Sequence, residues 1–122
     1  MSDAPRLHPG MLTDAAVITL EHVPVEPDQV VAGTPTTGFL VLDDDATRTV
    51  GVWEMSVGAM RDVEVDEVFV VLAGAATLEF EHPVADPIIL APGSVVRLTA
   101  GMRTIWTVRQ TLRKVYVTPT VE

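Results

Sequence analysis

The chain contains no cysteine among its 122 residues, which excludes disulfide bonds, thiolate metal ligands and cysteine nucleophiles. Histidine and carboxylate side chains are the strong metal ligands that remain. Apolar runs of membrane-spanning length are also missing, and the N-terminal segment lacks the basic start and apolar stretch of a signal peptide. These absences predict a cytoplasmic protein.

Basic residues are scarce. The chain has 8 lysines and arginines against 17 aspartates and glutamates, which gives a formal net charge of −9. A charge of this sign repels phosphate backbones and anionic lipid surfaces, so we expect neither nucleic acid nor a membrane as a partner. With 48% hydrophobic residues, the chain has enough apolar side chains to fold as one domain.

Helical periodicity is nearly absent as well. Short segments rich in valine, threonine and isoleucine alternate instead with turn signals built on glycine and proline. This pattern predicts an all-β fold. The expected strands cover residues 17–25, 38–42, 47–57, 68–72, 76–81, 88–90, 95–99, 105–108 and 112–118.

We expect this domain to have two parts. Residues 1–35, rich in proline and acidic residues, are expected to form an arm or outer strand packed on a barrel of residues 36–122. Residues 68–72 are apolar on both faces, although a sheet with one solvated face should alternate. Either the arm or a second subunit must cover the outer face, and we expect a homodimer.

Several glycine-centred segments occur together between about Gly51 and Val117. They are Gly51-Val-Trp-Glu54, Gly58, Asp66-Glu67 through Gly74, Pro92-Gly93 through Gly101, Trp106 and Arg113-Lys-Val-Tyr116. In this combination the chain resembles the cupin superfamily, and in particular the small single-domain cupins similar to ureidoglycine aminohydrolase, the DUF861 type. The resemblance implies a double-stranded β-helix, a conical barrel of two antiparallel sheets with the functional site at its interior mouth.

The resemblance also implies where a metal would be held. Cupin motifs place two histidines and a glutamate in a first motif and a third histidine in a second motif. Glu67 corresponds to the glutamate, but the histidine positions hold Arg61, Val63 and Thr104. Since first-row metals bind weakly without imidazole or thiolate ligands, we expect no metal and no cofactor.

Glu67 and Arg61 are the candidate catalytic residues. Alternate residues of a strand share a face, so residues 61, 63, 65 and 67 would look inward and the acidic Asp62, Glu64 and Asp66 outward into solvent. An inward carboxylate needs a partner, and we expect Arg61 to pair with Glu67 and replace the charge of the metal. Glu67 would then act as acid or base while Arg61 steadies an anionic group.

Four further side chains are candidates for binding a ligand. Trp106 shares strand parity with Thr104, so both are expected near the barrel mouth. Glu54 can face either side of its strand, and the pattern favours Phe69 as a core residue over a ligand contact. The three histidines, His8, His22 and His82, lack ligand-like spacing and are expected at the surface.

The sequence therefore predicts a metal-free barrel that binds a small molecule, which can be an anion, in its interior. Two alternatives stay open. One is a metal-dependent aminohydrolase or isomerase, with the metal held by Glu67 and other oxygen ligands. The other is a non-catalytic structural or regulatory module whose interior is filled by side chains.

Overall fold

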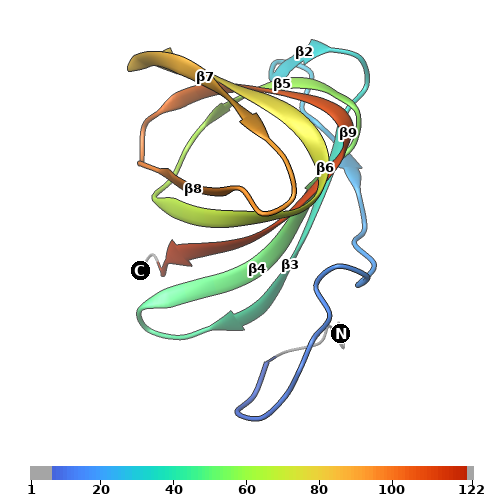
Figure 1. Cartoon of the computed structure of the whole chain (residues 1–122), viewed down its shortest axis with the longest axis vertical. Helices are drawn as coiled ribbons and strands as arrows, with labels where there is room; N and C mark the ends of the chain where they lie inside the picture. Colours follow the sequence, from blue (N-terminus) through green and yellow to red (C-terminus); the bar gives the residue numbers. More distant parts are fainter. Residues whose placement is uncertain (1–6, 121–122) are drawn as a thin grey trace.

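The computed structural model describes residues 7–120, and in that range the chain forms nine β-strands and no helix (Figure 1). It therefore has no helix there that is long and apolar enough to cross a membrane. The all-β prediction is confirmed. The strands are β1 (Val23–Pro24), β2 (Val30–Ala32), β3 (Thr36–Asp44), β4 (Arg48–Met55), β5 (Gly58–Val63), β6 (Glu67–His82), β7 (Val84–Leu90), β8 (Val95–Leu98) and β9 (Arg103–Pro119).

The two longest strands, β6 and β9, organise the sheet. They pair antiparallel along nearly their whole length, from Val68 opposite Val117 to His82 opposite Arg103. The other edge of β9 pairs with β5 and then with β4, and the other edge of β6 pairs with β8 and then with β7. The sheet thus divides on both sides of the central pair and curls into the open barrel that Figure 1 shows.

A bend in the middle of β6 depends on Gly74. The register against β9 shifts between Val71 and Ala76, and Gly74 has a φ of +99°. A Cβ at this position would lie 2.2 Å from the carbonyl oxygen of Thr111. Glycine alone tolerates this backbone and this approach, and it lets the expected strands at 68–72 and 76–81 continue as one. In the same way, β9 joins the expected strands at 105–108 and 112–118.

The concave side of the curled sheet holds the main core. Its fully buried members include Met55, Phe69, Leu78, Trp106 and Leu112. Burying one such side chain stabilises the fold by about 1.5–3 kcal/mol, so the core determines which face of each strand turns inward. That choice also determines which polar side chains reach the interior.

Residues 7–22 lie against the convex side of the sheet, whereas residues 23–35 form strands at its edges and contribute Val25 to the main core. The strand expected at 17–25 is reduced to β1, which pairs with β3, and β2 pairs with β5. Apolar residues of the arm pack on the convex face of β3 and β4, in a cluster of Leu7, Ala15, Ile18, Leu20, Leu42 and Val52. The domain division after residue 35 stays a prediction, and its ends at residues 1–6 and 121–122 lie outside the described range.

Candidate functional site

Lys114 lies at the centre of the candidate site, on the concave side of the sheet. Its Nζ donates a hydrogen bond to Oε2 of Glu67 over 2.6 Å, and the two side chains are only 5% and 9% exposed. In the sheet, β9 places Lys114 directly opposite Trp53 of β4, while Glu67 comes from the first residue of β6. The site therefore contains an ion pair that is almost completely removed from water.

Three aromatic rings surround the Lys114 ammonium. The ring centroids of Phe69, Trp53 and Trp106 lie 4.3, 4.6 and 4.6 Å from Nζ. The rings also pack on one another, with centroid distances of 5.5 Å between Trp53 and Trp106 and 5.7 Å between Phe69 and Trp106. A desolvated cation over an aromatic face gains up to about 2 kcal/mol. The rings thus offset part of the cost of burying the ammonium.

Glu64 is a second buried carboxylate in the interior. Its Oε2 accepts a hydrogen bond from Oγ1 of Thr104 at 2.6 Å and another from Nε1 of Trp106 at 3.0 Å. Its backbone N–H donates to the carbonyl of Met102, and its carbonyl accepts from the N–H of Gly101. Buried polar groups need such partners, since an unsatisfied one costs about 1–3 kcal/mol. These bonds fix Glu64 and the indole ring of Trp106 together.

Asp62 is the carboxylate best placed to exchange a proton. Its Oδ1 accepts a hydrogen bond from the N–H of Val63, and its side chain lines two cavities. Burial, followed by the nearby charge of Glu64, raises the pKa of Asp62 from 3.8 to about 6. Both protonation states are accessible near neutral pH, which is what a general acid or base requires.

The two cavities differ in their relation to the buried ion pair, since only the smaller one is lined by Glu67 and Lys114. One has a volume of about 170 Å³ and is lined by Glu64, Glu67, Lys114 and Tyr116, among others. The second has a volume of about 260 Å³ and is lined mainly by residues of β1 and the loop after it. Trp53 and Asp62 line both cavities. A polar group and an aromatic face at the junction are typical features of small-molecule sites.

Tyr116 occupies its position because residue 51 has no side chain. Gly51 lies opposite Tyr116 in the β4–β9 ladder, and a Cβ at position 51 would come within 2.3 Å of the tyrosine hydroxyl. Burial, with the charge of Glu67 as a second cause, raises the pKa of Tyr116 above its ordinary value. The phenol therefore stays protonated and can donate a hydrogen bond into the cavity.

The predicted ion pair between Arg61 and Glu67 is wrong. The Arg61 side chain is 54% exposed, and its Nε lies 3.6 Å from Oε1 of Glu81, whereas Glu67 pairs with Lys114. The interior positive charge expected from Arg61 is therefore supplied by β9. A catalytic role for Glu67 stays a prediction.

The error in the Arg61 prediction has a local cause. β5 ends at Val63 and β6 begins at Glu67, so residues 64–66 form a connection outside either strand. Strand alternation cannot be continued across such a break. Counted from the β5–β9 ladder instead, Asp62 opposes Thr104 on the inner side. Of the three acidic residues that were expected to face solvent, Asp62 and Glu64 therefore lie inside and only Asp66 lies at the surface.

Three of the predicted ligand-binding residues lie on the concave side. Trp106 and Thr104 are 1% and 0% exposed and both donate to Glu64, while Phe69 is fully buried under Lys114. Of these, only Trp106 lines a cavity described above. Contact of any of the three with a ligand stays a prediction.

Glu54, the fourth predicted ligand-binding residue, lies on the convex face beneath the arm. Its Oε2 accepts from Nε of Arg113 at 2.8 Å, and its Oε1 lies 2.7 Å from Nε2 of His22. Burial raises the pKa of Glu54, but the bonds from Arg113 and His22 outweigh this effect and the pKa is lowered. Glu54 is thus engaged in holding the arm. His22, expected at the surface, is partly buried by the same contacts.

Sequence reasoning missed Lys114, although the sequence contains a signal for it. Thr104 and Trp106 were expected to face inward, and Lys114 has the same strand parity. This parity is kept from one end of β9 to the other, since Thr104, Trp106 and Lys114 are all buried. A lysine with the parity of core residues predicts a buried cation, which needs a carboxylate partner such as Glu67.

The residues present do not fit the three-histidine metal site that the resemblance implies. At the corresponding positions, Arg61 and Val63 are exposed, and the hydroxyl of Thr104 donates to Glu64. Within residues 7–120, no group of three or more histidine, cysteine, aspartate or glutamate side chains is arranged to hold a metal ion. The three-imidazole donor set that the resemblance implies is therefore missing from residues 7–120.

Comparison with known proteins gives a consistent result. The family model for EutQ-like cupin domains matches residues 42–116. The structure is similar to the EutQ protein of Clostridium difficile, with a TM-score of 0.61 and 17% identity over 70% of this chain and 68% of that one. It is also similar to a putative ethanolamine utilization protein Q of Salmonella typhimurium, with a TM-score of 0.58 and 15% identity over 83% and 95% of the two chains.

A third similar structure is a DUF861-family protein of unknown function from Pseudomonas syringae pv. tomato. Its TM-score is 0.71 and its identity 21%, over 86% of this chain and 46% of that one. The present chain thus spans less than half the length of the Pseudomonas protein. No curated protein sequence matches the chain significantly. At these identities the structural likeness concerns the fold.

Proposed function

Because the chain belongs to the family of EutQ-like cupin domains and has the cupin fold, we propose that it binds a small organic molecule in the cavity beside Lys114 and in the second cavity that Asp62 also lines. The observation that carries this proposal is the buried Glu67–Lys114 pair inside three aromatic rings, next to open space. Burying two charges costs free energy that a hydrophobic pair would not. A polar group kept in a cavity at that cost is well suited to orienting a ligand.

The charges around the cavity favour a cationic ligand, or a neutral one with hydrogen-bond donors. Asp62, Glu64 and Glu67 line the same cavity as a single cation, Lys114, which Glu67 already neutralises. We therefore propose a small amine or amino alcohol rather than the anion that Arg61 suggested. The Salmonella relative is described as a putative ethanolamine utilization protein, and ethanolamine belongs to this chemical class.

We propose Asp62 as the residue that pairs with the amine. It is the carboxylate that both cavities share, and its Oδ1 accepts a hydrogen bond from the backbone N–H of Val63. Glu64 and Glu67 already bind Thr104, Trp106 and Lys114. If the protein is an enzyme, Asp62 would accept or return the proton of the bound group.

The cytoplasmic location stays a prediction from the sequence.

Ligand-induced stabilisation tests this proposal. Ethanolamine is titrated into wild-type protein and Asp62→Asn, with sodium acetate at equal ionic strength as the anionic probe. Binding to the folded state at 100 times Kd raises the free energy of unfolding by about 2.7 kcal/mol, so the melting temperature of the wild type should rise with ethanolamine and not with acetate. The rise should disappear in Asp62→Asn.

Asp86→Asn is the matched control, because Asp86 is exposed on β7 and lines neither cavity. This variant should respond to ethanolamine like the wild type. Stabilisation by acetate alone would contradict the charge argument, and an undiminished response in Asp62→Asn would place the amine elsewhere.

A further inference from the structure

Three side chains from separate parts of the chain form a hydrogen-bonded series where the arm meets β3 and β4. Nε2 of His22 lies 2.7 Å from Oε1 of Glu54, and Nδ1 of the same ring lies 2.8 Å from Oγ1 of Thr36. His22 immediately precedes β1, Thr36 is the first residue of β3, and Glu54 belongs to β4. A hydroxyl, an imidazole and a carboxylate in this order are the three groups of a hydrolytic triad, which is recognised by its geometry rather than by its order in the sequence.

The carboxylate determines which ring nitrogen of His22 can act as a base. Glu54 is held in place by Arg113, whose Nε donates to Oε2 over 2.8 Å. A carboxylate only accepts hydrogen bonds, so in the neutral ring the hydrogen lies on Nε2 and the lone pair lies on Nδ1. That lone pair faces the hydroxyl of Thr36. The separation fits a general base, which must lie about 2.6–3.2 Å from the group whose proton it removes.

Ser56 contacts Thr36 through both its backbone and its side chain. The N–H of Thr36 donates to Oγ of Ser56 over 2.8 Å, and the two hydroxyl oxygens lie 3.0 Å apart. When the Thr36 hydrogen is directed at His22, the hydroxyl of Ser56 can turn and donate to Oγ1 of Thr36. Such a bond stabilises the negative charge that forms on this oxygen when its proton leaves.

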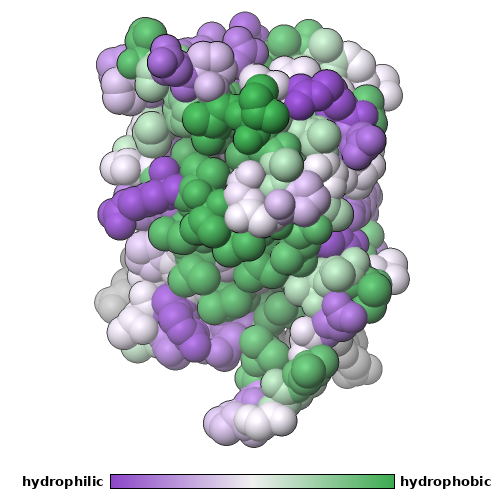
Figure 2. All heavy atoms as spheres, viewed as in Figure 1, coloured by the Kyte–Doolittle hydropathy of each residue, from purple (hydrophilic) through white to green (hydrophobic). Residues whose placement is uncertain are grey.

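Thr36 also lines a cavity of about 680 Å³, which is larger than either cavity at Asp62. Its walls include Val25, Val30 and Pro35, and none of the described residues that line it is charged. The cavity is separate from the hydrophobic surface that Figure 2 shows in the middle of the view, where Figure 1 draws β6, β8 and β9. A space of this kind suits an uncharged molecule with an apolar chain.

We propose that Thr36 and His22 form a second, hydrolytic site that cleaves uncharged esters with an apolar acyl group, with Glu54 as a positioning residue. Oγ1 of Thr36 would attack the carbonyl carbon while its proton passes to Nδ1 of His22. The tetrahedral intermediate then expels the alkoxide, which takes that proton and leaves as an alcohol. Water next attacks the acyl-threonine and gives a proton to Nδ1, and the Thr36 oxygen leaves, recovers that proton and frees the carboxylic acid. This site does not depend on amine binding at Asp62.

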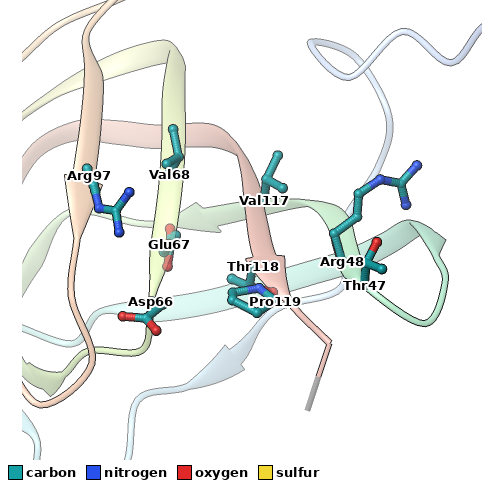
Figure 3. Close-up of a pocket in the computed structure, with 9 residues that line it drawn as sticks. All are labelled: Thr47, Arg48, Asp66, Glu67, Val68, Arg97, Val117, Thr118 and Pro119. Atoms are coloured by element: carbon teal, nitrogen blue, oxygen red, sulfur yellow. The ribbon is translucent and has the colours of Figure 1, made fainter. Parts of the chain in front are cut away.

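Covalent labelling tests the nucleophile directly. Diethyl p-nitrophenyl phosphate is uncharged, and transfer of its phosphoryl group to an activated hydroxyl releases p-nitrophenol. Peptide mapping by mass spectrometry should find the label on Thr36 of the wild type. Figure 3 shows Thr47 at a different pocket, of about 260 Å³, and its hydroxyl donates to Asp45 rather than to an imidazole. Thr47 is therefore the internal control and should stay unlabelled.

Hydrolysis of p-nitrophenyl butyrate provides the second measurement. His22→Asn should lower the rate by about 10²–10⁴-fold, the usual contribution of a positioned base. Thr36→Val should lose the activity, whereas Thr36→Ser keeps the hydroxyl and should retain it. His8→Asn is the matched control, because His8 is an exposed histidine and esters of p-nitrophenol react slowly with any accessible imidazole. This variant should be as active as the wild type.

Glu54→Gln should lower kcat and leave KM nearly unchanged, because the carboxylate orients His22 but does not line the cavity. A purely structural role, in which the arm loosens, would change KM as well. Melting curves establish that each variant is folded at the assay temperature. The proposal is overturned if Thr36 of the wild type carries no label, if Thr47 is labelled equally, or if His22→Asn hydrolyses the ester as fast as His8→Asn.

Discussion

Two adjacent cations of β9, Arg113 and Lys114, point to opposite faces of the sheet and are used differently. Arg113 lies on the convex face, where its Nε donates to Glu54 at 2.8 Å and its Nη1 donates to the carbonyls of Ala15 and Ile18 at 3.0 and 2.6 Å. Lys114 lies on the concave face, with Glu67 and three ring faces around its ammonium.

The difference follows from the chemistry of the two side chains. A guanidinium offers several N–H donors in a fixed plane, so Arg113 can hold a carboxylate and two backbone carbonyls at once and attach the arm. An ammonium is a compact charge on a flexible stem. Lys114 is therefore held by one oxygen and by rings that do not fix its direction. The Arg113–Glu54 pair on the convex face thus attaches the arm, whereas the Lys114–Glu67 pair on the concave face can adjust to a ligand.

The largest effect is expected from removing the concave cation. Lys114→Met would leave Glu67 buried without its partner, which should lower the free energy of unfolding by about 3–5 kcal/mol. The double variant Lys114→Met with Glu67→Gln should cost much less, because no unpaired charge remains. Urea denaturation of the two single variants and the double variant gives the coupling energy.

Arg61→Ala is the control for this cycle, since Arg61 is a half-exposed cation of the neighbouring strand β5. We expect a change within about 0.5 kcal/mol for this variant. Equal losses in the single variant Lys114→Met and the double variant would show that the lysine acts through packing rather than charge.

A smaller effect is expected on the convex face. Arg113→Lys keeps the charge but cannot reproduce the bonds to the carboxylate and both carbonyls, so the free energy of unfolding should fall by about 2 kcal/mol. Limited proteolysis should cleave within residues 8–20 faster than in the wild type. The tryptophan emission spectrum, which reports on the concave side, should stay unchanged. If the arm of this variant resists the protease as well as the wild type does, its apolar contacts alone are enough to hold it on the sheet.

The smallest effect concerns the pH dependence of Asp62. A carboxyl group whose folded pKa is raised from 3.8 to about 6 stabilises the fold below its unfolded pKa and loses that contribution as pH rises through 6. Asp62→Asn should therefore be more stable than the wild type at pH 8, by about 1 kcal/mol after allowance for solvent screening. The difference should vanish near pH 4 in urea melts.

Glu54 should behave in the opposite way. Its pKa is lowered in the folded protein, so its contribution is present above its ordinary pKa and is lost as the pH falls. Glu54→Gln should thus cost most at neutral pH, where Asp62→Asn is most favourable. The same sign for both variants would contradict the assignment of the two carboxylates to different surroundings.

Much of the fold could be predicted from the sequence, because it depends on local patterns. Valine-rich segments and glycine turns indicated most strands, and the resemblance of the segments between Gly51 and Val117 to cupins agrees with the family match at residues 42–116. The continuity of β6 through Gly74 was missed because a glycine ends a strand as readily as it bends one. Only the pairing with β9 distinguishes the two cases.

The site was harder to predict because it depends on strand boundaries. Glu67 was correctly placed in the interior. Residues 64–66 belong to neither strand, however, so alternation counted from Glu67 assigned the wrong face to β5. On that strand Asp62 points inward and Arg61 outward. One residue of error in a boundary exchanges every side chain between the faces. The partner of Glu67 comes from a strand far along the chain, and its parity could be judged only from Thr104 and Trp106.

The central position of β9 has a consequence for how the protein folds. The β3–β4 and β6–β7 hairpins pair neighbours in the sequence, but both need β9 to become one sheet, as Met55 opposite Leu112 illustrates. Such distant pairing delays folding to milliseconds or longer, because the loops must close before contacts form. Until residues 103–119 arrive, the inner edges of β4 and β6 are unpaired. Nascent or refolding chains would then be most vulnerable to aggregation through these two edges.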